Sequence, residues 1–189
     1  MKRLAAVLCL ALVAGQPSVA ASWRASEKAG RLTFEATQAG ARFTGEFSRF
    51  VADIAFDPTA PAECRFDVTI DTASARTGES QRDGLLRGQD FFWVDRYPNA
   101  SYQGSACRSE GAGFTLNGQM LLRGITHPVT LEFDFEPGPG GGGKLTGKAV
   151  VQRLDFGVGQ GEWEGTEWVG NEVTVRFDLT LSAAAAKAE

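Results

Sequence analysis

Histidine, cysteine and methionine are scarce in this sequence, which contains one, three and two of them among 189 residues. A single histidine excludes a metal site built from several imidazoles, and the cysteines do not match the spacing of structural zinc sites. His127 precedes Pro128 and is expected in a solvent-facing turn between strands. No nucleophile elbow marks a serine hydrolase, which leaves hydrolysis of an amphiphile as a distant alternative. We therefore predict that the protein is not an enzyme and holds neither a metal nor a cofactor.

Long apolar runs are missing after the first twenty residues, and so are clusters of positive charge. No later segment approaches the roughly 20 residues that cross a bilayer as a helix. Acidic side chains outnumber basic ones by 23 to 19, and the charges are scattered along the chain. Nucleic acid is therefore not an expected partner, because its binding requires a basic patch or stripe.

The first twenty residues have the pattern of a signal peptide. Lys2 and Arg3 precede the uncharged apolar run Leu4–Val13, and small residues around Ala20 form a cleavage site. A retained membrane anchor is the alternative, although the apolar run is short for it. Cleavage after residue 20 takes the net charge from −4 to −6. We expect a periplasmic, secreted protein whose single domain spans residues 21–182, with a flexible tail at 183–189.

Two cysteines remain after this cleavage, Cys64 and Cys107. An even number in an oxidising compartment favours one disulfide, with two buried thiols or intermolecular pairing as alternatives. Cys64 shares its parity with apolar neighbours, whereas Cys107 shares its parity with polar ones such as Gln103. A bond between them therefore requires a bulge or a strand end that corrects the phase.

The chain shows apolar side chains at every second position in eight segments, which is typical of β-strands with one buried face. Convincing amphipathic helices are nearly absent, so an all-β fold is predicted. The expected strands lie around residues 32–36, 41–57, 64–70, 100–106, 114–122, 129–135, 145–151 and 173–181.

The second of these strands is long and changes its parity. Phe43 and Phe47 point to one face at odd positions, whereas Phe50 and Phe56 do so at even positions. A bulge or bend around Ser48–Arg49 is therefore expected within one strand. At about 3.3 Å per residue and a tilt of about 40°, residues 41–57 give a height of roughly 40 Å, which favours an extended ligand.

Two of the connections are long. One runs from about Thr72 to Pro98 and contains a short helix within residues 80–92. The other runs from Leu154 to Asn171. The glycine-rich run Gly138–Gly143 is expected to be a flexible turn between two strands of the same sheet. Eight amphipathic strands predict an antiparallel barrel closed on itself, because closure removes the sheet edges. A β-sandwich is the alternative.

The residues resemble the YceI-like periplasmic proteins over about residues 33–181. No single stretch is diagnostic, but the order and spacing of the matching stretches are specific. They are Phe43-Thr44-Gly45-Glu46-Phe47, Ile54-Ala55-Phe56-Asp57-Pro58, Thr77-Gly78 through Arg82-Asp83 to Asp90-Phe91-Phe92 and Tyr97-Pro98, Leu122-Arg123-Gly124-Ile125-Thr126, and Asp155-Phe156-Gly157. The sequence departs from the family pattern at its two cysteines, at Trp93 and at the glycines 140–143.

The resemblance implies an extended, eight-stranded, lipocalin-like barrel that encloses a polyisoprenoid, quinone-precursor-like chain or another long lipid. Some family members are linked to stress responses. The expected partner is an isoprenoid or fatty-acyl lipid, loaded by transient contact with a membrane. A packed barrel without a ligand, acting as a stress-response or protein-interaction module, is the alternative, since a filled barrel shows the same alternation as a lined one.

Ligand contacts are predicted for the large inward-facing side chains of the expected barrel. For each of these residues a place in the core of a packed barrel is the more common role, because a filled barrel needs the same inward side chains. Phe91 and Phe92 are expected at a mobile mouth formed by the connection from Thr72 to Pro98. Arg82 and Asp83 are candidates for contact with a lipid head group, although Asp83 also suits the start of a short helix. The inward candidates are Phe47, Ile54, Phe56, Phe66, Val68, Tyr102, Leu116, Met120, Leu131, Phe133 and Phe177.

Overall fold

The computed structural model describes residues 22–26, 28–139 and 142–183. The expected signal peptide and nearly all of the expected tail lie outside these residues. Within them, no helix is long and apolar enough to cross a membrane. The strands are β1 Ser22–Ser26, β2 Gly30–Gln38, β3 Ala41–Phe47, β4 Phe50–Ala55, β5 Arg65–Asp71, β6 Ala75–Arg76, β7 Asn99–Ser105, β8 Arg108–Glu110, β9 Gly113–Leu122, β10 Ile125–Pro137, β11 Gly143–Gln152 and β12 Glu172–Ala183.

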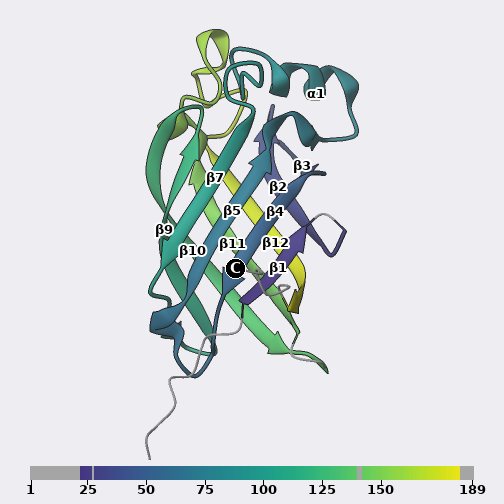
Figure 1. Ribbon diagram of the computed structural model, residues 1–189. Helices are drawn as coiled ribbons and strands as arrows, with labels where there is room; N and C mark the ends of the chain where they lie inside the picture. Colours follow the sequence, from purple (N-terminus) through teal and green to yellow (C-terminus); the bar gives the residue numbers. More distant parts are fainter. Residues whose placement is uncertain (1–21, 27, 140–141, 184–189) are drawn as a thin grey trace, which may run out of the picture.

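The strands form one antiparallel sheet that closes on itself as a barrel (Figure 1). Pairing runs from β1 through β4, β5, β7, β9, β10 and β11 to β12. The ring then closes where Trp23 pairs with Ala183 and Arg24 with Ser182. This closed ring of eight strands, all within the described residues, confirms the expected barrel and rules out the sandwich.

The described chain contains twelve strands rather than eight because four of the long strands are interrupted. The pairs β1 and β2, β3 and β4, β5 and β6, and β7 and β8 each follow one path along the barrel wall. The pairing register shifts at each break: Val51 lies opposite Ser26, whereas Glu46 lies opposite Thr33. The break expected at Ser48–Arg49 separates β3 from β4, and the buried positions change parity across it.

The short helix α1, Ser80–Arg87, lies across one end of the barrel together with the long loops (Figure 1). Glu79 begins the helix, since its carboxylate accepts hydrogen bonds from the backbone N–H groups of Gln81 and Arg82. These bonds lower the pKa of Glu79, as expected for a carboxylate at a helix N-terminus. Short 3₁₀ turns complete the connections: η1 Pro61–Glu63, η2 Thr72–Ser74, η4 Arg153–Phe156 and η5 Gly161–Trp163.

One prediction of local structure is wrong: His127 and Pro128 belong to strand β10 and do not lie in a turn. His127 pairs with Met120 of β9, and its ring meets that of Phe156 edge to face at 5.3 Å. The turn lies further back, at Arg123 and Gly124, whose φ angles are 52° and 76°. Two consecutive left-handed residues form the tight hairpin turn that suits the twist of the paired strands.

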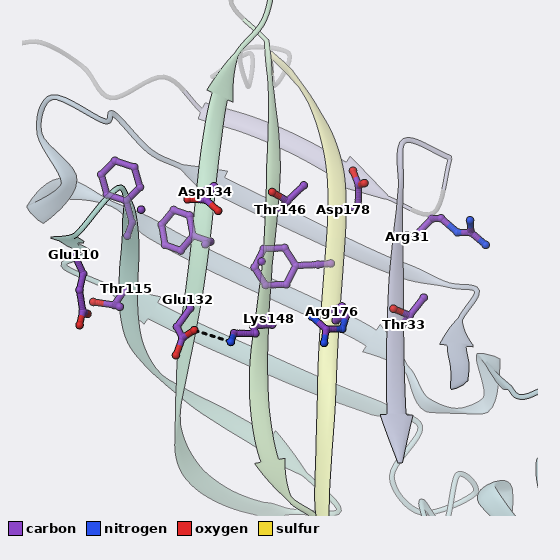
Figure 2. A pocket seen from close by; sticks show the side chains of 15 residues that line it. Arg31, Thr33, Glu110, Thr115, Glu132, Asp134, Thr146, Lys148, Arg176 and Asp178 are labelled. Carbon is purple, nitrogen blue, oxygen red and sulfur yellow. Dashed lines mark ion pairs between the residues drawn. The ribbon is translucent and has the colours of Figure 1, made fainter. Parts of the chain in front are cut away.

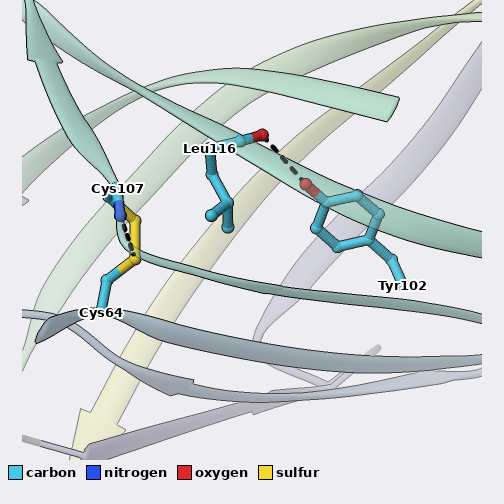
Figure 3. The surroundings of a disulfide bond; sticks show 4 residues. All are labelled: Cys64, Tyr102, Cys107 and Leu116. Carbon is cyan, nitrogen blue, oxygen red and sulfur yellow. Dashed lines mark hydrogen bonds between the residues drawn. A yellow bond between two sulfur atoms is a disulfide. The ribbon is translucent and has the colours of Figure 1, made fainter. Parts of the chain in front are cut away.

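The disulfide lies where β5 begins and β7 ends (Figure 3), whereas the other end of β5 leads through η2 and β6 toward α1. Cys64 and Cys107 are joined with a Cα–Cα distance of 5.7 Å. Between β7 and β8, Ala106 adopts φ 62°, and the register against β9 shifts by one residue. This break turns Cys107 inward, so that both cysteines are buried. The one-residue shift at Ala106 therefore brings Cys107 to the same face as Cys64, as the sequence analysis required for a bond between them.

Candidate functional site

The candidate site is an apolar cavity of about 110 Å³ inside the barrel. It is lined by side chains from β2 to β5, from β7 and from β9 to β12, together with Thr72 and Phe92. The lining residues are Leu32, Phe47, Phe50, Ala52, Ile54, Phe66, Val68, Ile70, Thr72, Phe92, Ala100, Ser101, Tyr102, Met120, Leu122, Val129, Leu131, Leu145, Ala149, Val151, Val175, Phe177 and Leu179.

The hydroxyl groups of Thr72 and Tyr102 are already engaged with the backbone. Thr72 Oγ1 lies 2.8 Å from the carbonyl oxygen of Tyr97, and Tyr102 Oη lies 3.0 Å from that of Leu116 (Figure 3). Burial raises the pKa of Tyr102, which keeps the phenol neutral. The wall therefore offers little to a charged or polar ligand, whereas an apolar chain leaves no buried polar group unsatisfied.

Phe92 and Phe47 close the cavity at the α1 end, with ring centroids 5.9 Å apart. Phe92 is buried, and its N–H donates to the carbonyl oxygen of Leu86 at the end of α1. Phe91, next to it, faces away from the cavity and packs against Trp163 at 5.7 Å. The structure thus contains a cap of packed aromatic rings at the position where the sequence predicts a mouth.

Two anchors hold this cap. The guanidinium of Arg123 donates to the carbonyl oxygens of Gln89, at 2.6 Å, and of Phe91. The carbonyl oxygen of Asp90 accepts hydrogen bonds from the N–H groups of Gly159 and Gln160, at 2.7 and 2.8 Å. Burial lowers the pKa of Arg123. The two long connections are therefore joined to each other and to the β9–β10 turn.

The two head-group candidates, Asp83 and Arg82, have different contacts in the structure. Asp83 accepts from the N–H and hydroxyl of Thr77, both at 2.7 Å, and so holds the chain before α1. Its burial favours the neutral form, but these hydrogen bonds prevail and lower its pKa. Arg82 instead stacks over Phe43 at 4.2 Å and lines an outer groove of about 590 Å³ with Trp163 and Trp168.

The interior candidates fall into two groups. Nine of them line the cavity: Phe47, Ile54, Phe66, Val68, Phe92, Tyr102, Met120, Leu131 and Phe177. Phe56, Phe133, Leu116 and Phe91 do not line it, and the first two belong to a dense aromatic cluster below it. Residues such as Phe50, Val129, Leu145 and Leu179 were missed, although they occupy the same alternating parity as the residues selected.

A second hollow, of about 970 Å³, lies on the outer wall over β9, β10, β11, β12 and β2 (Figure 2). It is larger than the interior cavity but open and polar. Its lining is rich in charged side chains: Lys148 lies 3.1 Å from Glu132, and Asp178 lies 3.3 Å from Lys144, which stands beside the hollow. Because exposed pairs of this kind are weakly held, this face is a solvated outer surface, and the interior cavity is the better candidate site. In the part of the chain that the structure describes, no group of three or more acidic, histidine or cysteine side chains is placed to hold a metal.

Comparison with known proteins gives consistent matches along the described chain. A family model described as YceI-like domain matches residues 23–181. A UPF0312 protein of Shewanella oneidensis is 28% identical over 134 residues, covering 67% of this chain and 70% of the relative. One from Yersinia pestis is 36% identical over 88 residues, 47% of this chain and 46% of the relative. The chain thus aligns with about half of the length of that relative.

Solved structures share the fold. Burkholderia cenocepacia BcnA superimposes with a TM-score of 0.76 at 27% identity, covering 82% of this chain and 96% of BcnA. A protein from Saccharophagus degradans, described as a polyisoprenoid binding domain, gives a TM-score of 0.61 at 15% identity. That alignment covers 87% of this chain and 99% of the other. At this low identity, the second likeness speaks for the fold alone.

Proposed function

We propose that this chain, which belongs to the YceI-like domain family, is an exported carrier that binds the apolar chain of an isoprenoid or fatty-acyl lipid inside its barrel. The observation that carries the proposal is the apolar cavity behind the Phe92 cap. The fold alone does not define a ligand, but the chemistry of this lining selects an apolar one. The same lining provides no acid–base pair for catalysis.

The volume of the cavity sets what binding must involve. About 110 Å³ is less than the roughly 150 Å³ of an apolar cavity that accepts benzene. A lipid chain therefore displaces side chains as it enters. Met120, which lines the cavity and is only partly buried, is suited to this because an unbranched thioether repacks easily. Displacement of the Phe92 cap opens the α1 end.

Energetics favour exchange with a membrane over capture from water. Burial of a methylene contributes about 0.8 kcal/mol relative to water, so a chain taken up from water would be held tightly and released slowly. A chain already in a bilayer is dry, and its transfer to the barrel is close to neutral. Such a balance suits a carrier that loads and unloads reversibly.

We place the lipid head group and the membrane contact at the α1 end. Trp168 is 68% exposed there, and indole rings are enriched at membrane–water interfaces. Arg82 and Arg42 line the same groove as Trp168 and provide donors for a polar head group. Export is part of the same proposal: the disulfide between Cys64 and Cys107 is typical of oxidising compartments.

Mass spectrometry of an organic extract from the protein purified from its native host tests the proposal. We expect a stoichiometric isoprenoid or fatty-acyl species. Ala149→Phe fills the cavity and should abolish this species, whereas Val150→Phe, on the outward face of the same strand and 47% exposed, should retain it. A folded wild-type protein without lipid would support the second candidate, a packed barrel that binds another protein, which the small cavity volume favours.

A further inference from the structure

We infer that a plug of aromatic rings limits the apolar chain accepted by the barrel to about nine to fourteen carbons below the Phe92 cap. The inference rests on the proposed function and names the size class of its ligand. The aromatic plug consists of Trp23, Phe56, Phe114, Phe133 and Phe135. It fills the end of the barrel that carries the disulfide.

The plug is packed around Phe56, which is fully buried at 0% exposure. Its ring centroid lies 4.9 Å from that of Phe114, 5.3 Å from Phe133 and 5.4 Å from Phe135, at interplanar angles of 72–82°. Edge-to-face contacts at these distances are the preferred geometry of aromatic pairs. Trp23 extends the plug through Phe135, at 5.2 Å. The cluster is therefore dense where the cavity is loosely filled.

Phe66 marks the floor of the cavity. Its ring lines the cavity from below and also meets the plug at Phe133, 5.3 Å away. None of the five plug residues lines the cavity. An apolar chain that passes the Phe92 cap therefore meets Phe66 and the plug before it reaches the far end of the barrel.

The disulfide holds the floor in place. Cys64 directly precedes β5, two residues from Phe66, and its bond to Cys107 ties this strand to the break after β7. Both cysteines are nearly inaccessible, at 2% and 3% exposure. The Phe66 floor is thus anchored covalently, whereas the Phe92 cap is held by non-covalent hydrogen bonds and ring packing.

The depth of the cavity gives the length of the chain. On β5 the lining extends from Ile70 to Phe66, and on β11 from Leu145 to Val151. These four and six residues cover about 13 and 20 Å along a strand, or about 10 and 15 Å along the barrel axis at the usual tilt. Three backbone bonds of an extended residue span about 3.5 Å, so a carbon chain spans about 1.2 Å per bond. This depth corresponds to an extended chain of about nine to fourteen carbons, which enters by displacing side chains that line the cavity of about 110 Å³.

The test measures displacement of an environment-sensitive naphthalene dye from the mature protein by straight-chain saturated carboxylates of increasing length. We expect affinity to rise about fourfold with each carbon, the factor that corresponds to burial of one methylene, and to stop rising between about nine and fourteen carbons. Phe56→Leu and Phe56→Ala should move this break to longer chains. Ala52→Leu, which narrows the cavity at mid-depth, should move it to shorter chains. Phe156→Leu, a change at a phenylalanine buried outside both cavity and plug, should leave the break in place.

The outcomes separate the inference from the function on which it rests. Failure of the wild-type protein to bind any chain would contradict the proposed function. Affinity that rises without a break well beyond about fourteen carbons would contradict the plug and leave the proposed function intact. If both Phe56 variants fail to fold, the Ala52→Leu variant provides the test. The inference is overturned if affinity for this variant stops rising at the same chain length as for the wild type.

Discussion

Gly118 of β9 lies directly against the phenol ring of Tyr102 of β7. A β-carbon at Gly118 would come within 2.4 Å of both Cζ and Oη of Tyr102 and within 2.6 Å of the backbone oxygen of Gln103. The missing side chain lets the phenol lie across the strand and reach the carbonyl oxygen of Leu116 at 3.0 Å. A polar group is thereby satisfied inside an apolar wall.

Gly118→Ala should therefore destabilise the protein by about 2–3 kcal/mol, because the added methyl group meets backbone as well as a ring and cannot be accommodated freely. Urea-induced unfolding measures the change. Gly84→Ala in α1 is the control, since a β-carbon there meets nothing within 4 Å. The control should be neutral or slightly stabilising; equal effects at the two glycines would contradict the close packing of Tyr102.

Tyr102 should make stability depend on alkaline pH. Its pKa is raised in the folded state by burial, so the folded state retains the proton more strongly than the unfolded chain, whose tyrosine pKa is about 10. This contribution is complete below pH 10 and is lost as the pH rises toward the folded-state pKa. Tyr102→Phe should be about 1 kcal/mol less stable at pH 8 and should lose less stability than the wild type between pH 9.5 and 11. Parallel unfolding curves of the two proteins over this range would refute the prediction.

Arg153 should be essential to the second long connection. It is 4% exposed, and its guanidinium donates to the carbonyl oxygens of Val158, Gly165, Val169 and Gly170 at 2.7–3.0 Å. Burial lowers the pKa of Arg153.

Lysine cannot reproduce this fork of donors, so Arg153→Lys should cost about 3 kcal/mol, as buried carbonyls lose their partners. A melting temperature lowered by about 6–12 °C corresponds to that loss. Arg176→Lys, on the exposed outer face of β12, should change the melting temperature by little. A similar small shift of the melting temperature in both variants would show that the hydrogen bonds of Arg153 are unimportant for stability.

The disulfide should contribute about 4 kcal/mol to stability, the chain-entropy value for a loop of this size, since Cys64 and Cys107 are 43 residues apart. Replacing both with alanine should lower the midpoint of urea unfolding accordingly. Thiol titration of the denatured, unreduced mature protein should find no free thiol. Two titratable thiols would show that the bond does not form.

The sequence predicted the barrel because apolar side chains recur at every second residue of each strand. Parity also located the break near Ser48–Arg49 and showed that Cys107 needed a phase correction. It did not locate that correction at Ala106, since alanine has no special preference for φ 62°. Strand β1 was not predicted, because Trp23 and Ala25 alone make too short a pattern.

The interior was harder to predict than the wall. Alternation identifies inward residues, but it does not tell a lined cavity from a filled one. Phe56 and Phe66 share the parity of cavity residues, yet Phe56 belongs to the plug because its ring meets three other rings at that level of the barrel. Such contacts depend on how distant strands are staggered. The height of roughly 40 Å expected from residues 41–57 therefore overestimates the space open to a ligand.

The pairing of β12 with both β1 and β2 has a consequence for the order of folding. Glu35 lies opposite Thr174, and Trp23 opposite Ala183. The strand pairing that closes the barrel therefore joins residues from the two ends of the described chain. Contacts this remote carry a large loop-closure cost and form late. The barrel cannot close until β12 has emerged, and a chain threaded through an export channel would stay open, with its strand edges exposed, until its last strand arrives.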